Sequence, residues 1–146
     1  MSAIAIVELT AEQTHPLRLS VLRFDTVTKD VAFPEDTWPG ARHLGLRVGD
    51  GLVAVSTWVP RPHLGQPAVQ LRGMATSRAA QGLGHGGTLL EGGCQRMAQG
   101  GTTLVWARAR DAALEFYLRH GFSVEGDGFI DQNTQLPHHL IVRSLA

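Results

Sequence analysis

Alternation of apolar and polar residues predicts strands along much of this chain. Period-two patterns bounded by glycine and proline turns predict strands over residues 3–9, 43–48, 52–59, 68–76, 102–109, 122–131 and 138–145. Gly49-Asp50-Gly51 separates the second and third of these strands and is typical of a hairpin turn. We expect the last two strands to pair antiparallel across a polar loop at residues 133–137.

A first helix is expected after the opening strand, and the sequence offers two places for its start. Thr10 with Gln13 forms a capping-box pair, whereas Thr14 precedes a proline that suits a first helical turn. Residues 24–40 follow without a periodic pattern, and loops of this length in a compact domain are often functional. The inner side of the helix would carry Leu17, Val21 and Leu22.

Two more helices are expected in the second half of the chain. Residues 85–99 place apolar and small residues at a period of 3.6, although each glycine inside a helix costs about 1 kcal/mol relative to alanine. Packing must therefore hold this helix, and its glycines would let it lie close to a sheet or a ligand. Residues 111–120 form a shorter helix that Gly121 ends in a left-handed conformation. This order of elements predicts an α/β fold, a mixed sheet with helices on both faces, in one domain over residues 1–146.

Composition narrows the class of protein. With 146 residues, 43% hydrophobic and 18% charged, the chain is long and apolar enough to fold around a core. Its 13 basic and 13 acidic residues leave no net charge, so no global field favours nucleic acid or an anionic membrane as a partner. The apolar opening segment is too short, and too poor in basic residues, for a signal or membrane-spanning segment. We expect a cytoplasmic protein.

Cysteine and histidine usage argues against a metal centre. The single cysteine, Cys94, excludes an internal disulfide and a cysteine-rich zinc site. It lies on the inward stripe of the helix at 85–99, which favours a small buried hydrophobe over a reactive thiol. The seven histidines are scattered, without a helical His-x3-His pair, and no metal cofactor is expected.

A glycine-rich loop, Gln81-Gly82-Leu83-Gly84-His85-Gly86, separates a predicted strand from a predicted helix. Free N–H groups and the helix macrodipole at such a junction suit a diphosphate, although a glycine turn can also serve close packing alone. The loop with Gly87 also satisfies GxGxxG. A dinucleotide-binding unit would carry an acidic residue about 20 positions later, where Thr102 and Thr103 stand. A Walker loop is excluded because no Gly-Lys-Ser/Thr follows.

Two blocks of the chain resemble the GCN5-related N-acetyltransferases, the GNAT superfamily. Residues 76–90, TSRAAQGLGHGGTLL, contain its Q/R-x-x-G-x-G/A loop, filled by Gln81, Gly84 and Gly86. Residues 113–122, ALEFYLRHGF, resemble its A-x-x-F-Y-x-x-x-G-F helix and turn. The resemblance covers residues 69–143 well and the N-terminal half only by the order of elements. It implies the GNAT fold, a mixed, mostly antiparallel sheet flanked by helices on both faces, with parallel strands splayed at a cofactor cleft.

The resemblance implies an acetyl-CoA-dependent, bacterial-type N-acetyltransferase that acts on a primary amine of a small molecule or peptide by direct attack. The coenzyme diphosphate would bind N–H groups of residues 83–87, and the pantetheine arm would pair with the main chain of the preceding strand. The implied cofactor-binding residues are Met74, Ala75, Thr76, Gln81, Gly82, Leu83, Gly84, His85, Gly86 and Gly87. A longer acyl donor, a non-catalytic acyl-CoA sensor and a homodimer remain open within the same fold.

The resemblance also implies catalytic roles. Tyr117 matches the family tyrosine near the thioester sulfur, where a phenol can protonate the departing thiolate, with core packing as the alternative. The family has no fixed general base, and a water chain often serves. Candidates here are Glu35, Asp36, His138 and His139, although adjacent strand residues point to opposite faces, so at most one of the two histidines enters the cleft.

Two further positions stay unassigned. Many family members carry asparagine where Arg110 stands, so Arg110 is not counted as a cofactor-binding residue; it would reach the coenzyme phosphates or face solvent. Trp38, in the long loop, could border an acceptor pocket.

Overall fold

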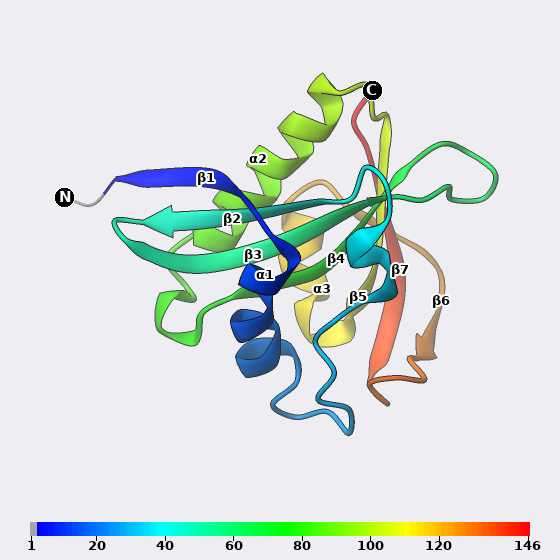
Figure 1. Ribbon diagram of the computed structural model, residues 1–146. Helices are drawn as coiled ribbons and strands as arrows, with labels where there is room; N and C mark the ends of the chain where they lie inside the picture. The colour runs from blue at the N-terminus through cyan, green and yellow to red at the C-terminus, as the bar shows by residue number, and fades with distance from the viewer. Residues whose placement is uncertain (1–2) are drawn as a thin grey trace.

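The seven strands form one sheet in the order β1-β2-β3-β4-β5-β7-β6 (Figure 1). This computed structural model describes residues 3–146. Neighbouring strands are antiparallel except for β4 and β5, which are parallel. The elements are β1 Ile4–Leu9, α1 Ala11–Leu17, β2 Arg42–Val48, β3 Gly51–Pro60, β4 Val69–Thr76, α2 His85–Gln99, β5 Leu104–Arg110, α3 Leu114–Arg119, β6 Ser123–Ile130 and β7 Pro137–Ser144.

The parallel strands β4 and β5 separate halfway along their length. Their pairing is limited to Val69 with Val105 and Gln70 with Trp106. Between β3 and β4 the register slips, because β4 holds one extra residue near Gly73, whose φ is +60°. A bulge of this kind bends a strand and increases its twist. The splayed parallel strands implied by the resemblance are therefore present.

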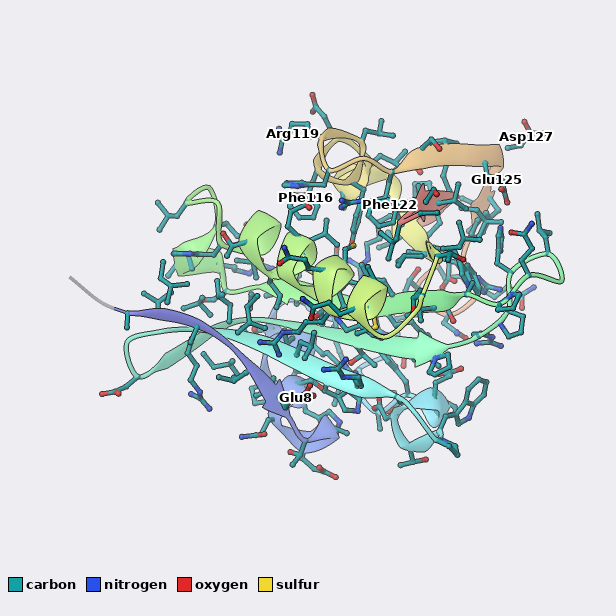
Figure 2. The ribbon with its side chains drawn as sticks, turned by 90° about the horizontal axis from the view of Figure 1, so that it is seen from above. Glu8, Phe116, Arg119, Phe122, Glu125 and Asp127 are labelled. Atoms are coloured by element: carbon teal, nitrogen blue, oxygen red, sulfur yellow. The ribbon has the colours of Figure 1, made fainter. Side chains whose placement is uncertain are left out.

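Helices cover both faces of the sheet, as predicted. Figure 2 shows α2 and α3 on one face and the α1 segment on the other. A Cβ added at Gly93 would lie 2.1 Å from Trp58 Cζ2, and one at Gly92 would lie 2.1 Å from Ile6 Cδ1. The glycines of α2 thus let the helix lie against the sheet more closely than alanines would, and burial of Trp58 anchors the core there.

The first helix begins after Thr10, the first of the two predicted starts. Thr10 Oγ1 accepts from the Gln13 N–H at 3.3 Å, and Thr10 N–H donates to Gln13 Oε1 at 2.8 Å. Pro16 lies inside α1, and the chain continues as a π-helical turn over Arg18–Leu22. The predicted inner residues Leu17, Val21 and Leu22 are only half-buried, whereas Arg18 is 1% exposed. The sequence pattern did not identify this buried guanidinium.

The remaining elements follow the predictions with small shifts. The loop at residues 24–40 contains a short 3₁₀ turn, Pro34–Thr37. The predicted helix at 111–120 divides into a 3₁₀ turn, Asp111–Ala113, and α3, and Gly121 follows with φ +83°. The final strands pair antiparallel, with β7 between β5 and β6. Within residues 3–146 no helix has the length and hydropathy to cross a membrane.

Candidate active site

The glycine loop presents free main-chain donors at the start of α2. Gly82 and Gly84 have φ of +80° and +83°, a conformation that side chains other than glycine rarely adopt. The first hydrogen bond of α2 runs from Thr88 N to Gly84 O at 3.1 Å. The N–H groups of His85, Gly86 and Gly87 therefore have no acceptor within the helix and point toward its N-terminal end, where an anion is favoured.

A cavity of about 840 Å³, called here the loop cavity, adjoins these donors. Its walls come from the loop, from Thr76 at the end of β4 and from Phe116, Arg119 and His120. Arg119 adds positive charge to the wall of the loop cavity, and it was not among the predicted residues because the motif leaves its position unspecified. The predicted loop residues that line the cavity are Gln81, Gly82, Gly84, His85, Gly86 and Gly87.

Two of the predicted cofactor residues, Leu83 and Ala75, line neither cavity, whereas Gln81 lines the loop cavity and also makes an internal contact. The Leu83 side chain is 67% exposed and does not line the loop cavity, so only its main chain can contribute. Gln81 Nε2 donates to Thr76 O at 2.9 Å, which closes the loop onto the end of β4. Ala75 is 2% exposed and faces the core.

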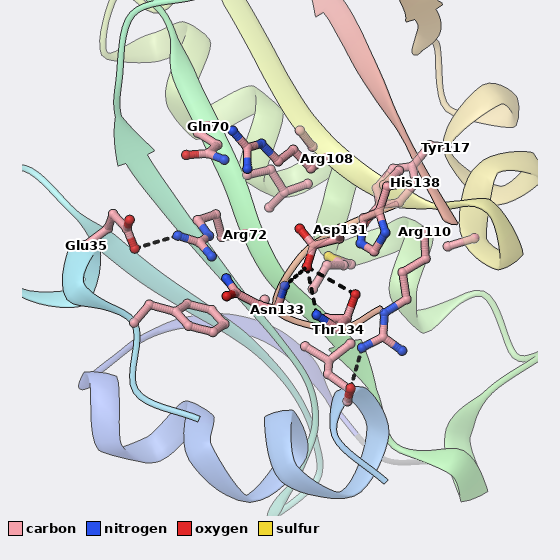
Figure 3. A pocket seen from close by; sticks show the side chains of 18 of the residues that line it. Glu35, Gln70, Arg72, Arg108, Arg110, Tyr117, Asp131, Asn133, Thr134 and His138 are labelled. Carbon is pink, nitrogen blue, oxygen red and sulfur yellow. Dashed lines mark hydrogen bonds and ion pairs between the residues drawn. The ribbon is translucent and has the colours of Figure 1, made fainter. Parts of the chain in front are cut away.

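A second cavity, of about 310 Å³, fills the opening between β4 and β5 and is called here the cleft cavity (Figure 3). Met74 lines it, whereas Thr76 lines the loop cavity, so β4 runs from one cavity to the other. Its polar and aromatic walls include Arg23, Phe33, Glu35, Arg61, Gln70, Arg72, Arg108, Arg110, Tyr117, Asp131, Asn133, Thr134 and His138.

Tyr117 reaches the cleft cavity from α3 and is 8% exposed. Its ring packs edge-on against Phe116 at 5.1 Å and Phe122 at 5.5 Å between centroids. Burial raises the pKa of the Tyr117 phenol far above its ordinary value, so the hydroxyl keeps its proton at neutral pH. The aromatic contacts fix the ring, and the side chain contributes to the wall of the cavity.

The adjacent histidines point to opposite faces of β7, as predicted. His138 is 6% exposed and lines the cleft cavity. His139 lies outside it, with Nδ1 at 2.6 Å from Asp111 Oδ1. His138 Nδ1 is 2.9 Å from Leu136 O, and a carbonyl oxygen only accepts, so the neutral ring carries its proton on Nδ1. Nε2 of His138 is then left with a lone pair that can take a proton.

The two carboxylates predicted as bases are held by arginines. Glu35 lines the cleft cavity, but its oxygens lie 2.5 Å from Arg72 Nη1 and 3.3 Å from Arg61 Nη1. Asp36 lies outside the cavity, paired with Arg18. Burial opposes its ionisation, but hydrogen bonds from Arg18 and the Phe33 N–H outweigh that effect and lower the pKa of Asp36. Of the four candidate bases, only His138 lines the cavity with a basic atom, Nε2, that is not held in an ion pair.

Asp131 lines the cleft cavity and was not predicted as a site residue from the sequence. Its carboxylate accepts from the Thr134 N–H at 2.9 Å, the Thr134 hydroxyl at 3.1 Å and the Asn133 N–H at 3.1 Å. Burial opposes ionisation, but these hydrogen bonds and nearby His138 together lower the pKa of Asp131. An anion is therefore fixed beside His138, and the only sequence signal was a polar turn between two strands.

Four arginines that line the cleft cavity were also missed, because they come from separate segments with no shared motif: Arg23, Arg61, Arg72 and Arg108. Arg110 neither reaches the loop cavity nor faces solvent freely. It donates to Leu22 O and lies 3.5 Å from Asp25 Oδ1, joining the end of β5 to the π-helical turn. Trp38 does not line the cavity; its ring lies 5.2 Å from the Arg61 guanidinium.

Cys94 is buried at 2% exposure on the inner side of α2, as predicted. Burial raises the pKa of its thiol to about 11, which disfavours the reactive thiolate. Within residues 3–146, no group of three histidine, cysteine or acidic side chains is placed to hold a metal ion.

Comparison with known proteins gives a consistent result. The model of the Acetyltransferase (GNAT) family matches residues 8–122, which extends the likeness into the N-terminal half. The uncharacterized N-acetyltransferase YitI of Bacillus subtilis is 28% identical over 124 residues, 83% of each chain. A Lactobacillus plantarum crystal structure aligns over 99% of both chains with a TM-score of 0.82 at 19% identity. An aminoglycoside 6'-N-acetyltransferase solved with coenzyme A aligns over 97% of both chains, with a TM-score of 0.75 at 13% identity.

Proposed function

Because the chain belongs to the GNAT acetyltransferase family, we propose that it transfers an acetyl group from acetyl-CoA to a primary amine of a small molecule or peptide. The edge of β4 is the observation that carries this proposal. Beyond Gln70 this edge has lost its partner β5, and it joins the loop cavity at Thr76 to the cleft cavity at Met74. An extended pantetheine arm can pair with such an edge as an added strand does.

The diphosphate of the coenzyme belongs at the loop cavity in this proposal. The free N–H groups at the start of α2 would bind its oxygens, and Arg119 would add a charge-assisted contact. A solved relative's complex with coenzyme A supports the type of donor. With the diphosphate held there and the arm along β4, the thioester would lie in the cleft cavity near Tyr117.

The reaction then needs two proton movements. The neutral amine attacks the acetyl carbonyl carbon, a C–N bond forms, and the C–S bond breaks as the electron pair leaves on sulfur. Tyr117 would donate a hydrogen bond and then its proton to that thiolate, and the proton that His138 takes from the amine would return to the Tyr117 oxygen through solvent. His138 Nε2 would accept the proton that the amine nitrogen loses, directly or through water. The products are the N-acetylated amine and free coenzyme A.

Substrate positioning would supply much of the rate. Holding an amine and a thioester in contact distance removes the entropy cost of a bimolecular encounter.

The proposal is tested in two steps. Calorimetry should detect binding of acetyl-CoA and none of NAD at equal concentration; no heat with millimolar acetyl-CoA would overturn it. An amine panel is then assayed by release of the coenzyme thiol. His138→Gln should lower kcat, whereas His139→Gln, its neighbour on the opposite face, should leave kcat near the parent value. Tight acetyl-CoA binding without turnover on any amine would instead indicate an acyl-CoA sensor.

A further inference from the structure

The cleft cavity carries a surplus of positive charge that the reaction itself does not require. Five arginines line it, Arg23, Arg61, Arg72, Arg108 and Arg110, against the carboxylates of Glu35 and Asp131, a surplus of three positive charges. The whole chain is electrically balanced, so this excess is local. In the proposed function, the phosphates of acetyl-CoA would occupy the loop cavity, and its thioester end is uncharged.

Carboxylates of the protein satisfy these guanidiniums only in part. Arg110 has an ion-pair partner outside the cavity, Asp25 at 3.5 Å. Arg61 and Arg72 share the single carboxylate of Glu35. Arg23 donates through Nε to Asp30 O at 2.9 Å, a main-chain acceptor without full charge. Over residues 3–146, no carboxylate lies within ion-pairing distance of Arg23 or Arg108. The cavity therefore holds donors with unused capacity for an anion.

The arginines also repel one another. Burial lowers the pKa of Arg72, and the positive charges of Arg61 and Arg108 lower it further. The negative charge of Glu35 raises this pKa but does not cancel the decrease. The pKa of Arg23 is lowered by burial and by nearby guanidiniums as well. Arginine remains protonated at neutral pH, so a bound anion would relieve this repulsion. A polycationic acceptor would increase it.

The two ends of the cleft cavity carry different side chains. Figure 3 shows Arg72 and Arg108 near Gln70 at one end, and Tyr117 with His138 at the other. Asp131 stands beside His138, and its ionised carboxylate attracts an ammonium group. A ligand that carries a carboxylate and an amine would thus be oriented with its amine toward Tyr117 and its carboxylate toward Arg72 and Arg108.

We propose that the acceptor is an amine that also carries a carboxylate, of the amino-acid or short-peptide class, and that Arg72 and Arg108 bind this carboxylate. The inference rests on the proposed acetyltransferase function. Guanidinium groups suit carboxylates because two parallel N–H donors match two oxygens. Arg108, on β5 and without an ion-pair partner, is available for this role without breaking an internal contact.

The experiment compares matched acceptors that differ only in the carboxylate. Each L-amino acid of a panel is assayed with its α-amide and its decarboxylated amine, by thiol release with saturating acetyl-CoA. The carboxylate form should have a kcat/KM at least roughly tenfold higher, the size expected for one charge-assisted hydrogen bond. Equal or better use of the amide or the plain amine would overturn the inference while leaving the acetyltransferase function in place.

Variants assign the effect to the cavity. Arg108→Gln should raise KM for the carboxylate acceptor about tenfold and leave KM for the amide and for acetyl-CoA unchanged. Arg47→Gln, on β2 and outside both cavities, is the matched control and should change none of these values. A rise in KM for acetyl-CoA in Arg108→Gln would show that this arginine serves the coenzyme, which would overturn the inference.

A binding measurement separates this inference from the proposed function. Calorimetry of the coenzyme A complex is run with N-acetyl-L-amino acids and with their amides. Preferential binding of the carboxylates, lost in Arg108→Gln, supports the inference even if no acceptor turns over. Absence of binding by every carboxylate tested overturns it, even if a neutral amine is acetylated.

Discussion

The Arg18 guanidinium and the Asp36 carboxylate form a buried two-point ion pair, with N–O distances of 2.8 and 2.9 Å. Their side chains are 1% and 5% exposed. Arg18 also donates to Val31 O at 2.8 Å and to Thr57 Oγ1 at 2.7 Å. One side chain thus ties the π-helical turn to the long loop and to β3. The pair also fixes the 3₁₀ turn that carries Glu35 into the cleft cavity.

Breaking this pair should destabilise the protein strongly. Arg18→Met leaves the Asp36 carboxylate buried without its partner, and we expect a loss of about 3–5 kcal/mol in the free energy of unfolding, measured with urea. Arg42→Met is the control, because its ion pair with Glu8 is exposed and should contribute less than about 1 kcal/mol. A loss in Arg18→Met no larger than in the control would contradict the assigned role.

The same pair should make stability fall in acid. The pKa of Asp36 is lower in the folded protein than its ordinary value, so its stabilisation is complete above the unfolded-state pKa, about 4. It is lost as the pH falls through the lower, folded-state pKa. Unfolding free energy measured from pH 6 to about 2.5 should therefore decline less steeply in Asp36→Asn than in the parent. Parallel curves for the two proteins would show that Asp36 does not contribute.

A side chain at the loop glycine should weaken coenzyme binding. Gly84 has φ +83° and no atom within 4 Å of an added Cβ, so Gly84→Ala strains the backbone where the diphosphate would approach. We expect KM for acetyl-CoA to rise about tenfold, a change of about 1.4 kcal/mol. Gly101→Ala is the matched control, because Gly101 has φ +97°, has no atom within 4 Å of an added Cβ, and lies beyond the C-terminal end of α2. This variant should lose stability without a change in KM for acetyl-CoA. Equal KM values in the two variants would contradict diphosphate binding at residues 83–87.

Removing the Tyr117 hydroxyl should slow chemistry and spare binding. In Tyr117→Phe the ring contacts with Phe116 and Phe122 remain, so the unfolding midpoint should change little. Loss of an acid at the thioester sulfur is expected to lower kcat about a hundredfold. KM for acetyl-CoA should stay within about twofold, since one lost neutral hydrogen bond has a modest effect on binding. Unchanged kcat in a well-folded variant would assign Tyr117 to packing alone.

Cys94 should be inert in the native protein. Burial, which raises its thiol pKa to about 11, leaves little thiolate at pH 8. A disulfide reagent such as dithionitrobenzoate should label no thiol in the folded chain and one after denaturation. Rapid labelling of the folded chain would contradict the burial of this side chain, and it would also add a background to thiol-release assays.

Local patterns determined much of this fold. Period-two alternation located the strands, because a half-buried strand places its apolar side chains on one face. A period of 3.6 in the apolar and small residues located α2, because that spacing puts them on one face of a helix. The capping pair of Thr10 and Gln13 and the left-handed glycine at Gly121 are local devices, and the sequence displays them directly. The glycine loop belongs to this group as well, since the anion site proposed there depends on its main chain and not on its side chains.

The tertiary structure decided what distant segments build together. Arg18 has the local sequence context of a surface residue on an amphipathic helix, yet it is buried because Asp36 and Thr57 arrive from other elements and accept hydrogen bonds from its Nη atoms. The arginines of the cleft cavity come from strands and loops far apart in the chain, so no local spacing reveals their surplus charge. Of the two adjacent histidines, only the tertiary structure showed that His138 is the one on the cleft-cavity face of β7. Charge balance within a cavity depends on three-dimensional neighbours, which a sequence read in one dimension does not specify.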